Sequence, residues 1–149
     1  MSGYQPSGDA PAAYNGRLWG ARARDWADIQ EGMARPVYEV VLERAGVGAG
    51  IRYLDVGCGS GMAAQRAAAR GAQASGIDAA EALLAIARSR VPESDFRQGD
   101  IQDLPFADEM FDVVAGFNSF QYAADPVVAL AEPRRVTNPT SPIRAIENP

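Results

Sequence analysis

The sequence predicts an α/β domain with a Rossmann-like, doubly wound and mostly parallel sheet of about four to five strands. Short apolar runs alternate with helical segments along the middle of the chain, and the first run ends in a glycine-rich turn. This order is typical of parallel sheets with helices on both faces. The 149 residues, 47% hydrophobic and 22% charged, suffice for one domain with a buried core.

The N-terminal third divides into two parts. Residues 1–16 are rich in Gly, Pro, Ser and Ala without apolar periodicity, so we expect a flexible N-terminus. From residue 17 to residue 46 apolar residues recur at helical spacing, which predicts helices in front of the sheet. Pro36 fits the first turn of the second of these helices, because the missing proline N–H has no intrahelical role there.

The α/β core is predicted over residues 51–135. Its strands are expected at 51–56, 72–77, 94–98 and 111–117, and its helices at 61–70, 79–90 and 126–135. Pro133 is expected to interrupt the last helix, because proline inside a helix costs about 3 kcal/mol.

Residues 136–149 read as an irregular, Pro-rich tail in which 143–146 form at most a short edge strand. The strand at 111–117 would then have an open edge, and a homodimer through this sheet edge is one way to cover it.

Composition excludes several classes of function. The chain has no His, all 14 basic residues are Arg, and Cys58 is the single cysteine, so we expect no metal site and no internal disulfide. A net charge of −5 disfavours nucleic-acid partners. No apolar run reaches the roughly 18 residues of a membrane helix, and the first residues lack a secretory pattern. We therefore expect a cytoplasmic protein without a membrane partner.

The glycine-rich turn at 53–61, YLDVGCGSG, is the most informative motif. Gly57 and Gly59 allow a tight turn and a close approach of the backbone to a ligand. A dinucleotide fingerprint would need a third glycine at position 62, which is Met62, so a pyrophosphate cofactor is less favoured. Asp55, just before the glycines, suits a cationic group of a ligand.

Two further Asp residues follow predicted strands. Asp78 is placed to accept hydrogen bonds from ribose hydroxyls, although Asp78-Ala-Ala-Glu81 is also a capping-box pattern. Asp100 is placed to accept from an adenine amino group with Ile101 against the ring, although taken alone it is better explained as a turn residue after Gly99. For Asp78, the place after the glycine-rich loop favours the ribose role, and the two roles can coexist.

In these motifs the sequence resembles class I S-adenosylmethionine-dependent methyltransferases of the group that acts on small molecules. The resemblance rests on 53–61, 76–78, 99–126 (GDIQDLPFADEMFDVVAGFNSFQYAADP) and 129–139, and it covers about 18–139. It implies S-adenosylmethionine as cofactor, S-adenosylhomocysteine as product and a small-molecule methyl acceptor. Members of the family continue after the last helix with further strands, so we expect a C-terminally truncated enzyme in which the cofactor-binding half is present.

The resemblance also implies roles for individual residues. The methionine part of the cofactor would be bordered by Asp55, Gly57, Cys58 and Gly59. The nucleoside would be held by Asp78, Ala79, Asp100 and Ile101. Asn118 would line the sulfonium and substrate side. Trp19 or Trp26 would cover the cofactor, or would simply pack between helices.

The expected function is methyl transfer to a small molecule, with alignment of nucleophile and methyl carbon as the main source of rate. Without His or Lys, a proton acceptor has to be a carboxylate, a Tyr or water. Two alternatives remain. One is a non-catalytic protein that binds S-adenosylmethionine or a partner, and the other is a nicotinamide-dependent dehydrogenase, against which Met62 argues.

Overall fold

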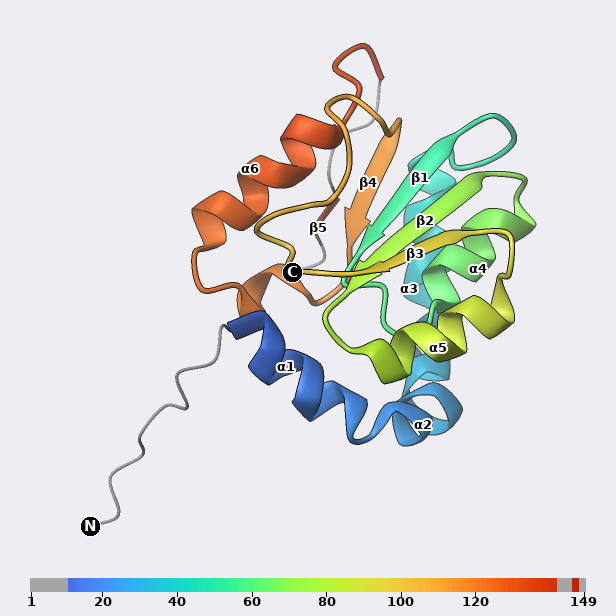
Figure 1. Cartoon of the computed structure of the whole chain (residues 1–149). Coiled ribbons are helices and arrows are strands. Elements are labelled where there is room, and N and C mark those ends of the chain that lie inside the picture. The colour runs from blue at the N-terminus through green and yellow to red at the C-terminus, as the bar shows by residue number, and fades with distance from the viewer. Residues whose placement is uncertain (1–10, 142–145, 148–149) are drawn as a thin grey trace.

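The structure, a computed structural model, describes residues 11–141 and 146–147. In this part of the chain five parallel strands form one sheet in the order β3-β2-β1-β4-β5. The strands are β1 (Arg52–Val56), β2 (Gln73–Asp78), β3 (Asp95–Gln98), β4 (Val113–Gly116) and β5 (Ile146–Glu147). The order reverses between β1 and β4, which are neighbours although two strands separate them in sequence (Figure 1). The predicted Rossmann-like sheet is confirmed.

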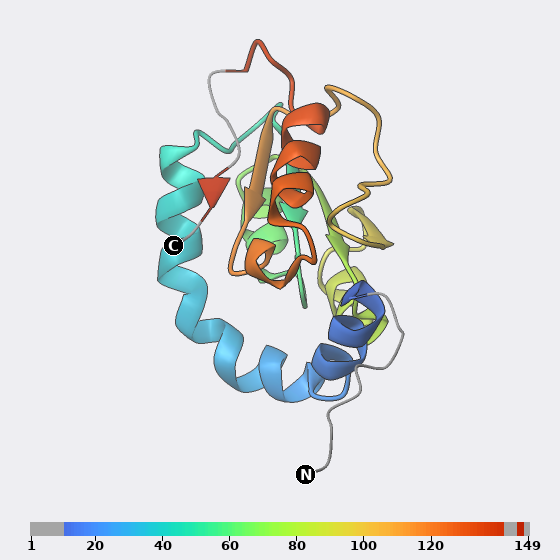
Figure 2. The same ribbon diagram turned by 90° about the vertical axis from the view of Figure 1, so that its left-hand side faces the viewer.

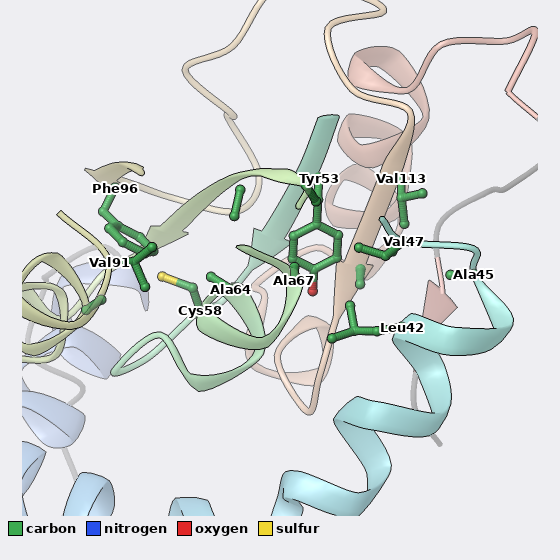
Figure 3. Close-up of a cluster of buried hydrophobic side chains, with 14 of the residues drawn as sticks. Leu42, Ala45, Val47, Tyr53, Cys58, Ala64, Ala67, Val91, Phe96 and Val113 are labelled. Carbon is green, nitrogen blue, oxygen red and sulfur yellow. The ribbon is translucent and has the colours of Figure 1, made fainter. Parts of the chain in front are cut away.

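Helices cover both faces of the sheet. Adjacent residues of a strand point to opposite faces, so Tyr53 joins one buried cluster and Leu54 the other. The first cluster includes side chains of α3 (Glu31–Arg44), α4 (Met62–Ala69) and α5 (Glu81–Arg90), and Figure 3 shows Tyr53 and Val113 beside Leu42 within it. The second cluster packs against α6 (Pro126–Val136). The core thus lies in two layers, one on each face of the sheet.

The N-terminal helices begin earlier than the sequence suggested. Residues 1–10 lie outside the described residues, but α1 occupies Pro11–Gly20, so the prediction of a flexible N-terminus is wrong for 11–16. Packing explains the difference, because α1 contacts α5 and brings Trp19 to a small apolar cluster with Leu83. Proline also suits the first position of a helix. In Figures 1 and 2, α1 is separate from the long α3.

Between α1 and α3 lie α2 (Ala23–Asp25) and a π-helical turn, η1 (Trp26–Gln30). The expectation that Pro36 opens a helix is wrong, because α3 begins at Glu31 and contains Pro36 in its interior. Pro36 removes the hydrogen bond to the Gly32 carbonyl. Both residues are exposed, so water can reach this turn. Tertiary packing of the opposite side of α3, through Tyr38 and Leu42, keeps the helix continuous.

The short 3-10 helix η2 (Phe120–Tyr122) leads into α6, which begins after Asp125. The Asp125 carboxylate accepts hydrogen bonds from the Val127 and Val128 N–H groups at 2.9 and 3.3 Å. Pro133 does not interrupt α6, contrary to the prediction, since the helix continues to Val136 with Pro133 buried. Arg135, which bonds to the Glu132 carboxylate and the Leu104 carbonyl, anchors this last turn.

After α6 the chain is not uniformly irregular. Phe111 and Thr137 form a parallel bridge, and β5 pairs with β4 through Ala115↔Ile146 and Gly116↔Glu147. A short edge strand is therefore present at 146–147, which overlaps the expected 143–146 at Ile146, while 142–145 lie outside the described residues. β5 covers part of the β4 edge, and a homodimer through this edge stays a prediction. Among the described residues, no helix has the length and apolar character needed to cross a membrane.

Candidate functional site

A cavity of about 370 Å³ lies where the carboxyl ends of the strands meet the N-terminal helices. Its volume is within the range of small-molecule sites, and its place beside the β1/β4 reversal is where open α/β sheets bind ligands. Seven of the nine site residues predicted from the sequence line it: Gly57, Gly59, Asp78, Ala79, Asp100, Ile101 and Asn118. Asp55 and Cys58 lie behind the cavity wall.

The glycine-rich loop is held tightly against its surroundings. Gly57 has φ +75°, and a Cβ there would lie 2.4 Å from the Ser119 Cβ, so this position needs glycine. The Gly57 and Cys58 N–H groups donate to the Ile77 carbonyl at 2.8 and 3.0 Å. Ser119 donates its hydroxyl to the Val56 carbonyl at 2.8 Å. The loop is therefore fixed to both neighbouring strands before any ligand arrives.

Asp78 connects the loop to the start of α5. Its Oδ2 accepts from the Gly59 N–H at 2.9 Å, and its Oδ1 accepts from the Ala80 N–H at 2.8 Å. The capping-box interpretation is wrong in detail, because Ala80 occupies the N-cap position and Asp78 makes a local turn before it. Burial raises the pKa of Asp78. A carboxylate has about four acceptor positions, so hydroxyl groups of a ligand can still bind it from the cavity.

Asp100 also has a structural role together with its place in the cavity wall. Its Oδ1 accepts from the Gln102 N–H at 2.8 Å, as expected of a turn residue. Asp100, Ile101 and Gln102 all line the cavity. The two readings that the sequence left open for Asp100 are therefore compatible.

Aromatic side chains enclose the cavity on the side away from the sheet. Trp19 and Trp26 both line it and pack edge to face, with ring centroids 5.5 Å apart. Tyr122 meets Trp19 at 6.1 Å, and Tyr38 meets Phe117 at 4.7 Å. The two Trp residues therefore both pack between the N-terminal helices and line the cavity. The sequence did not mark Tyr38 as a site residue, because its position in the helical pattern is also that of an ordinary core residue.

Gly16 allows α1 to approach the cavity closely. A Cβ at Gly16 would lie 2.4 Å from the Ala79 carbonyl oxygen, whereas a Cβ at Gly20 would meet Ala82 at an ordinary 3.7 Å. Asn15, beside it, donates its side-chain N–H to the Tyr122 carbonyl at 3.2 Å. The helix α1 therefore spans the cavity, from the residue that follows β2 to η2.

We expect Gly16→Ala to displace α1 and to weaken ligand binding in the cavity by about tenfold, because the backbone of Ala79 cannot retreat easily. Gly20→Ala is the matched control in the same helix and should bind normally, with a gain of about 0.5–1 kcal/mol in stability. Titration of both variants with S-adenosylhomocysteine measures the difference. Equal affinities would show that α1 does not cover the ligand.

Glu31 occupies the N-terminus of α4, on the side of the loop away from the cavity opening. Its Oε1 accepts from the Met62 N–H at 3.0 Å, and its Oε2 accepts from the Ser60 hydroxyl at 2.5 Å. Arg90 pairs with the same carboxylate at 2.6 Å, and Glu31 is only 2% exposed. In dinucleotide sites a phosphate takes this helix terminus. Here a protein carboxylate has taken its place, which agrees with the argument from Met62.

Cys58 turns its side chain away from the cavity into the core, so the thiol does not line the cavity, and its place beside the methionine part of a ligand stays a prediction. Gly76 on β2 leaves the space, because a Cβ there would lie 2.8 Å from both the Cys58 Sγ and a Phe96 ring carbon. Burial raises the pKa of the Cys58 thiol. The thiol is thus a small apolar packing group and not a nucleophile.

Asp55 lies under the loop, 2% exposed, and its Oδ1 has no hydrogen-bond partner among the described residues. Burial, together with the nearby Asp78 and Glu31 carboxylates, raises the pKa of Asp55 to about 8. Burying a polar atom without a hydrogen-bond partner lowers the stability of the folded state, unless a bound ligand supplies the partner. In the region of the glycine-rich loop, Asp55 is therefore the residue whose hydrogen-bonding capacity the described part of the protein leaves unfilled.

The raised pKa of Asp55 predicts how stability depends on pH. An acid that binds its proton more tightly in the folded state loses folding stability as pH rises from its unfolded towards its folded pKa. From pH 6 to pH 8 we expect a fall of about 2 kcal/mol in the free energy of unfolding. Asp55→Asn, which cannot ionise, should lack this fall. Urea titrations at both pH values measure the free energy of unfolding of each protein. An equal fall from pH 6 to pH 8 in wild type and in Asp55→Asn would contradict the prediction.

Comparison with known proteins agrees with this geometry. A family model described as a methyltransferase domain matches residues 54–143. The chain is 37% identical over 121 residues to the malonyl-acyl-carrier-protein O-methyltransferase of Erwinia pyrifoliae, covering 81% of this chain and 46% of that protein. It is 37% identical over 129 residues to the ubiquinone biosynthesis O-methyltransferase of Hahella chejuensis, covering 78% and 53%.

Among solved structures, that of the 4+2 cyclase SpnF aligns with a TM-score of 0.79 at 26% identity, over 91% of this chain and 60% of that chain. The chain spans about half the length of the curated relatives it matches.

Proposed function

Because the chain belongs to the methyltransferase domain family, we propose that it binds S-adenosylmethionine in this cavity and transfers the methyl group to a small-molecule acceptor. S-adenosylmethionine is the methyl donor of the family. The two curated relatives described above are named O-methyltransferases, which favours an oxygen atom as the acceptor.

The observation that carries this proposal is the distribution of charge around the cavity. The charged side chains among the described residues of its wall are Asp78 and Asp100, and no Arg lines it. Behind this wall Glu31 fills the anion position of α4 and is itself paired with Arg90. A ligand with a sulfonium and an ammonium group fits such surroundings, whereas the pyrophosphate of a nicotinamide dinucleotide would meet no cation.

The residues present fit each part of this cofactor. Asp78 would bind the ribose hydroxyls, Asp100 the adenine amino group, and Ile101 one face of the ring. Gly57 and Gly59 line the cavity where the methionine part would lie, and Asp55 stands behind them with an Oδ1 that has no partner in the described part of the chain. When bound, the cofactor supplies an electrophilic methyl group on sulfur.

The protein's own contribution is to align the acceptor and to exclude water. Asn118 follows β4 with φ +55°, a conformation that Asn tolerates, and its side-chain oxygen accepts from Gln121. Trp19, Trp26 and Tyr122 close the cavity from outside. Proton removal from the acceptor needs a carboxylate, a Tyr or water, since the chain has no His and no Lys.

Transfer of a labelled methyl group from S-adenosylmethionine to a panel of small hydroxyl compounds tests the proposal. We expect acceptor-dependent labelling that S-adenosylhomocysteine inhibits. Stoichiometric binding without transfer to any acceptor would instead support a non-catalytic binding protein. The similarity to a cyclase of the same fold shows that the fold also serves proteins named for another activity.

A further inference from the structure

We propose that the acceptor is an uncharged aromatic hydroxyl compound, and that the cavity discriminates against carboxylated or phosphorylated acceptors. This inference rests on the proposed methyl transfer and specifies its substrate class. It is drawn from the part of the cavity wall between α3 and the end of β4, which we call the acceptor wall: Ala34, Val37, Tyr38, Phe117, Asn118 and Tyr122.

The acceptor wall offers apolar and aromatic surface. Tyr38 and Phe117 pack edge to face, with ring centroids 4.7 Å apart and an interplanar angle of 67°, and both residues line the cavity. Ala34 and Val37 add aliphatic surface from the same helix. The polar groups of the acceptor wall are the Asn118 amide and the Tyr38 and Tyr122 hydroxyls, which can orient a neutral hydroxyl. Flat aromatic compounds match this combination in shape and polarity.

The charges around the acceptor wall oppose a second anion. No guanidinium lines the cavity in the described part of the chain, and Arg90 is bound to Glu31 and to the Ser60 carbonyl at 3.1 Å. Asp78 and Asp100 face the same cavity. A carboxylate that enters must lose water without gaining an ion pair, which is unfavourable. A neutral acceptor avoids this cost.

A matched pair of ligands tests the inference directly. Para-cresol and para-hydroxybenzoate share the phenol ring and differ in a methyl group against a carboxylate. Calorimetric titration of the protein loaded with S-adenosylhomocysteine should show para-cresol binding at least roughly tenfold more tightly. Equal or tighter binding of para-hydroxybenzoate overturns the inference, and so does the absence of binding by both compounds.

A matched pair of variants locates the effect. Val37→Arg places a guanidinium at the acceptor wall and should raise the affinity for para-hydroxybenzoate by about tenfold. Val40→Arg, on the same helix and similarly exposed but outside the cavity wall, should leave both affinities unchanged. An equal response of the two variants would contradict the role of the wall. Loading with S-adenosylhomocysteine is measured first, so failure of the proposed function is recognised separately.

Discussion

Replacing Asp78 by Ala is expected to lower the affinity for S-adenosylmethionine by about two to three orders of magnitude. Hydrogen bonds to a charged group contribute about 1.5–3 kcal/mol each, and a ribose offers two hydroxyls to this carboxylate. The same change removes the acceptor that holds the Gly59 N–H at 2.9 Å, so the glycine-rich loop loses an anchor as well. Calorimetric titration of the variant measures the effect.

Two controls separate these contributions. Asp78→Asn retains one oxygen acceptor for the loop but loses the charge, so its affinity should fall between those of wild type and Asp78→Ala. Asp95→Ala removes an exposed carboxylate of β3 that pairs with Arg97 outside the cavity, and it should bind normally. If Asp78→Ala bound S-adenosylmethionine as tightly as Asp95→Ala, the ribose role of Asp78 would be wrong.

The largest effect on stability is expected for Glu31→Ala, at about 3–5 kcal/mol in the free energy of unfolding. The substitution leaves the Arg90 guanidinium without its carboxylate partner and removes the acceptor of the Ser60 hydroxyl and the Met62 N–H. Glu31 also connects the N-terminal helices to the loop. Urea denaturation followed by far-UV circular dichroism gives the difference.

An exposed ion pair provides the matched control. Glu81 pairs with Arg88 on the surface of α5, with side chains about half exposed, so Glu81→Ala should cost between about 0 and 1 kcal/mol. Replacing Glu31 and Arg90 together by apolar residues should cost less than Glu31→Ala alone, since no charge is then left unpaired. If Glu31→Ala lowered the free energy of unfolding as little as Glu81→Ala, the buried Glu31–Arg90 pair would not stabilise the fold.

The fold was predictable where the local pattern and the tertiary structure agree. β1, β4 and α5 lie within two residues of their predicted bounds, because apolar runs and glycine turns mark them in the sequence. The interior position of Pro36 and the continuation of α6 past Pro133 were not predictable from propensity. In both cases contacts with the sheet outweigh a local cost, as the burial of Leu42 and Val136 shows.

The candidate site shows the same division. Gly57 and Asp100 follow strands and Asp78 ends β2. Strand ends meet at one edge of a parallel sheet, so the sequence was sufficient to bring these residues together. Glu31 and Tyr38 both come from α3, whose direction depends on the π-helical turn η1 before it. No motif marks that turn, and a buried Glu on a helix reads as a surface residue until its partners Ser60 and Arg90 are known.

Calorimetric titration of the protein with S-adenosylmethionine, S-adenosylhomocysteine and NAD is the most direct test of the account. The acidic cavity and the occupied N-terminus of α4 predict that both sulfur ligands bind at one site per chain and that NAD does not bind. Binding of NAD without any response to the sulfur ligands would contradict the central claim.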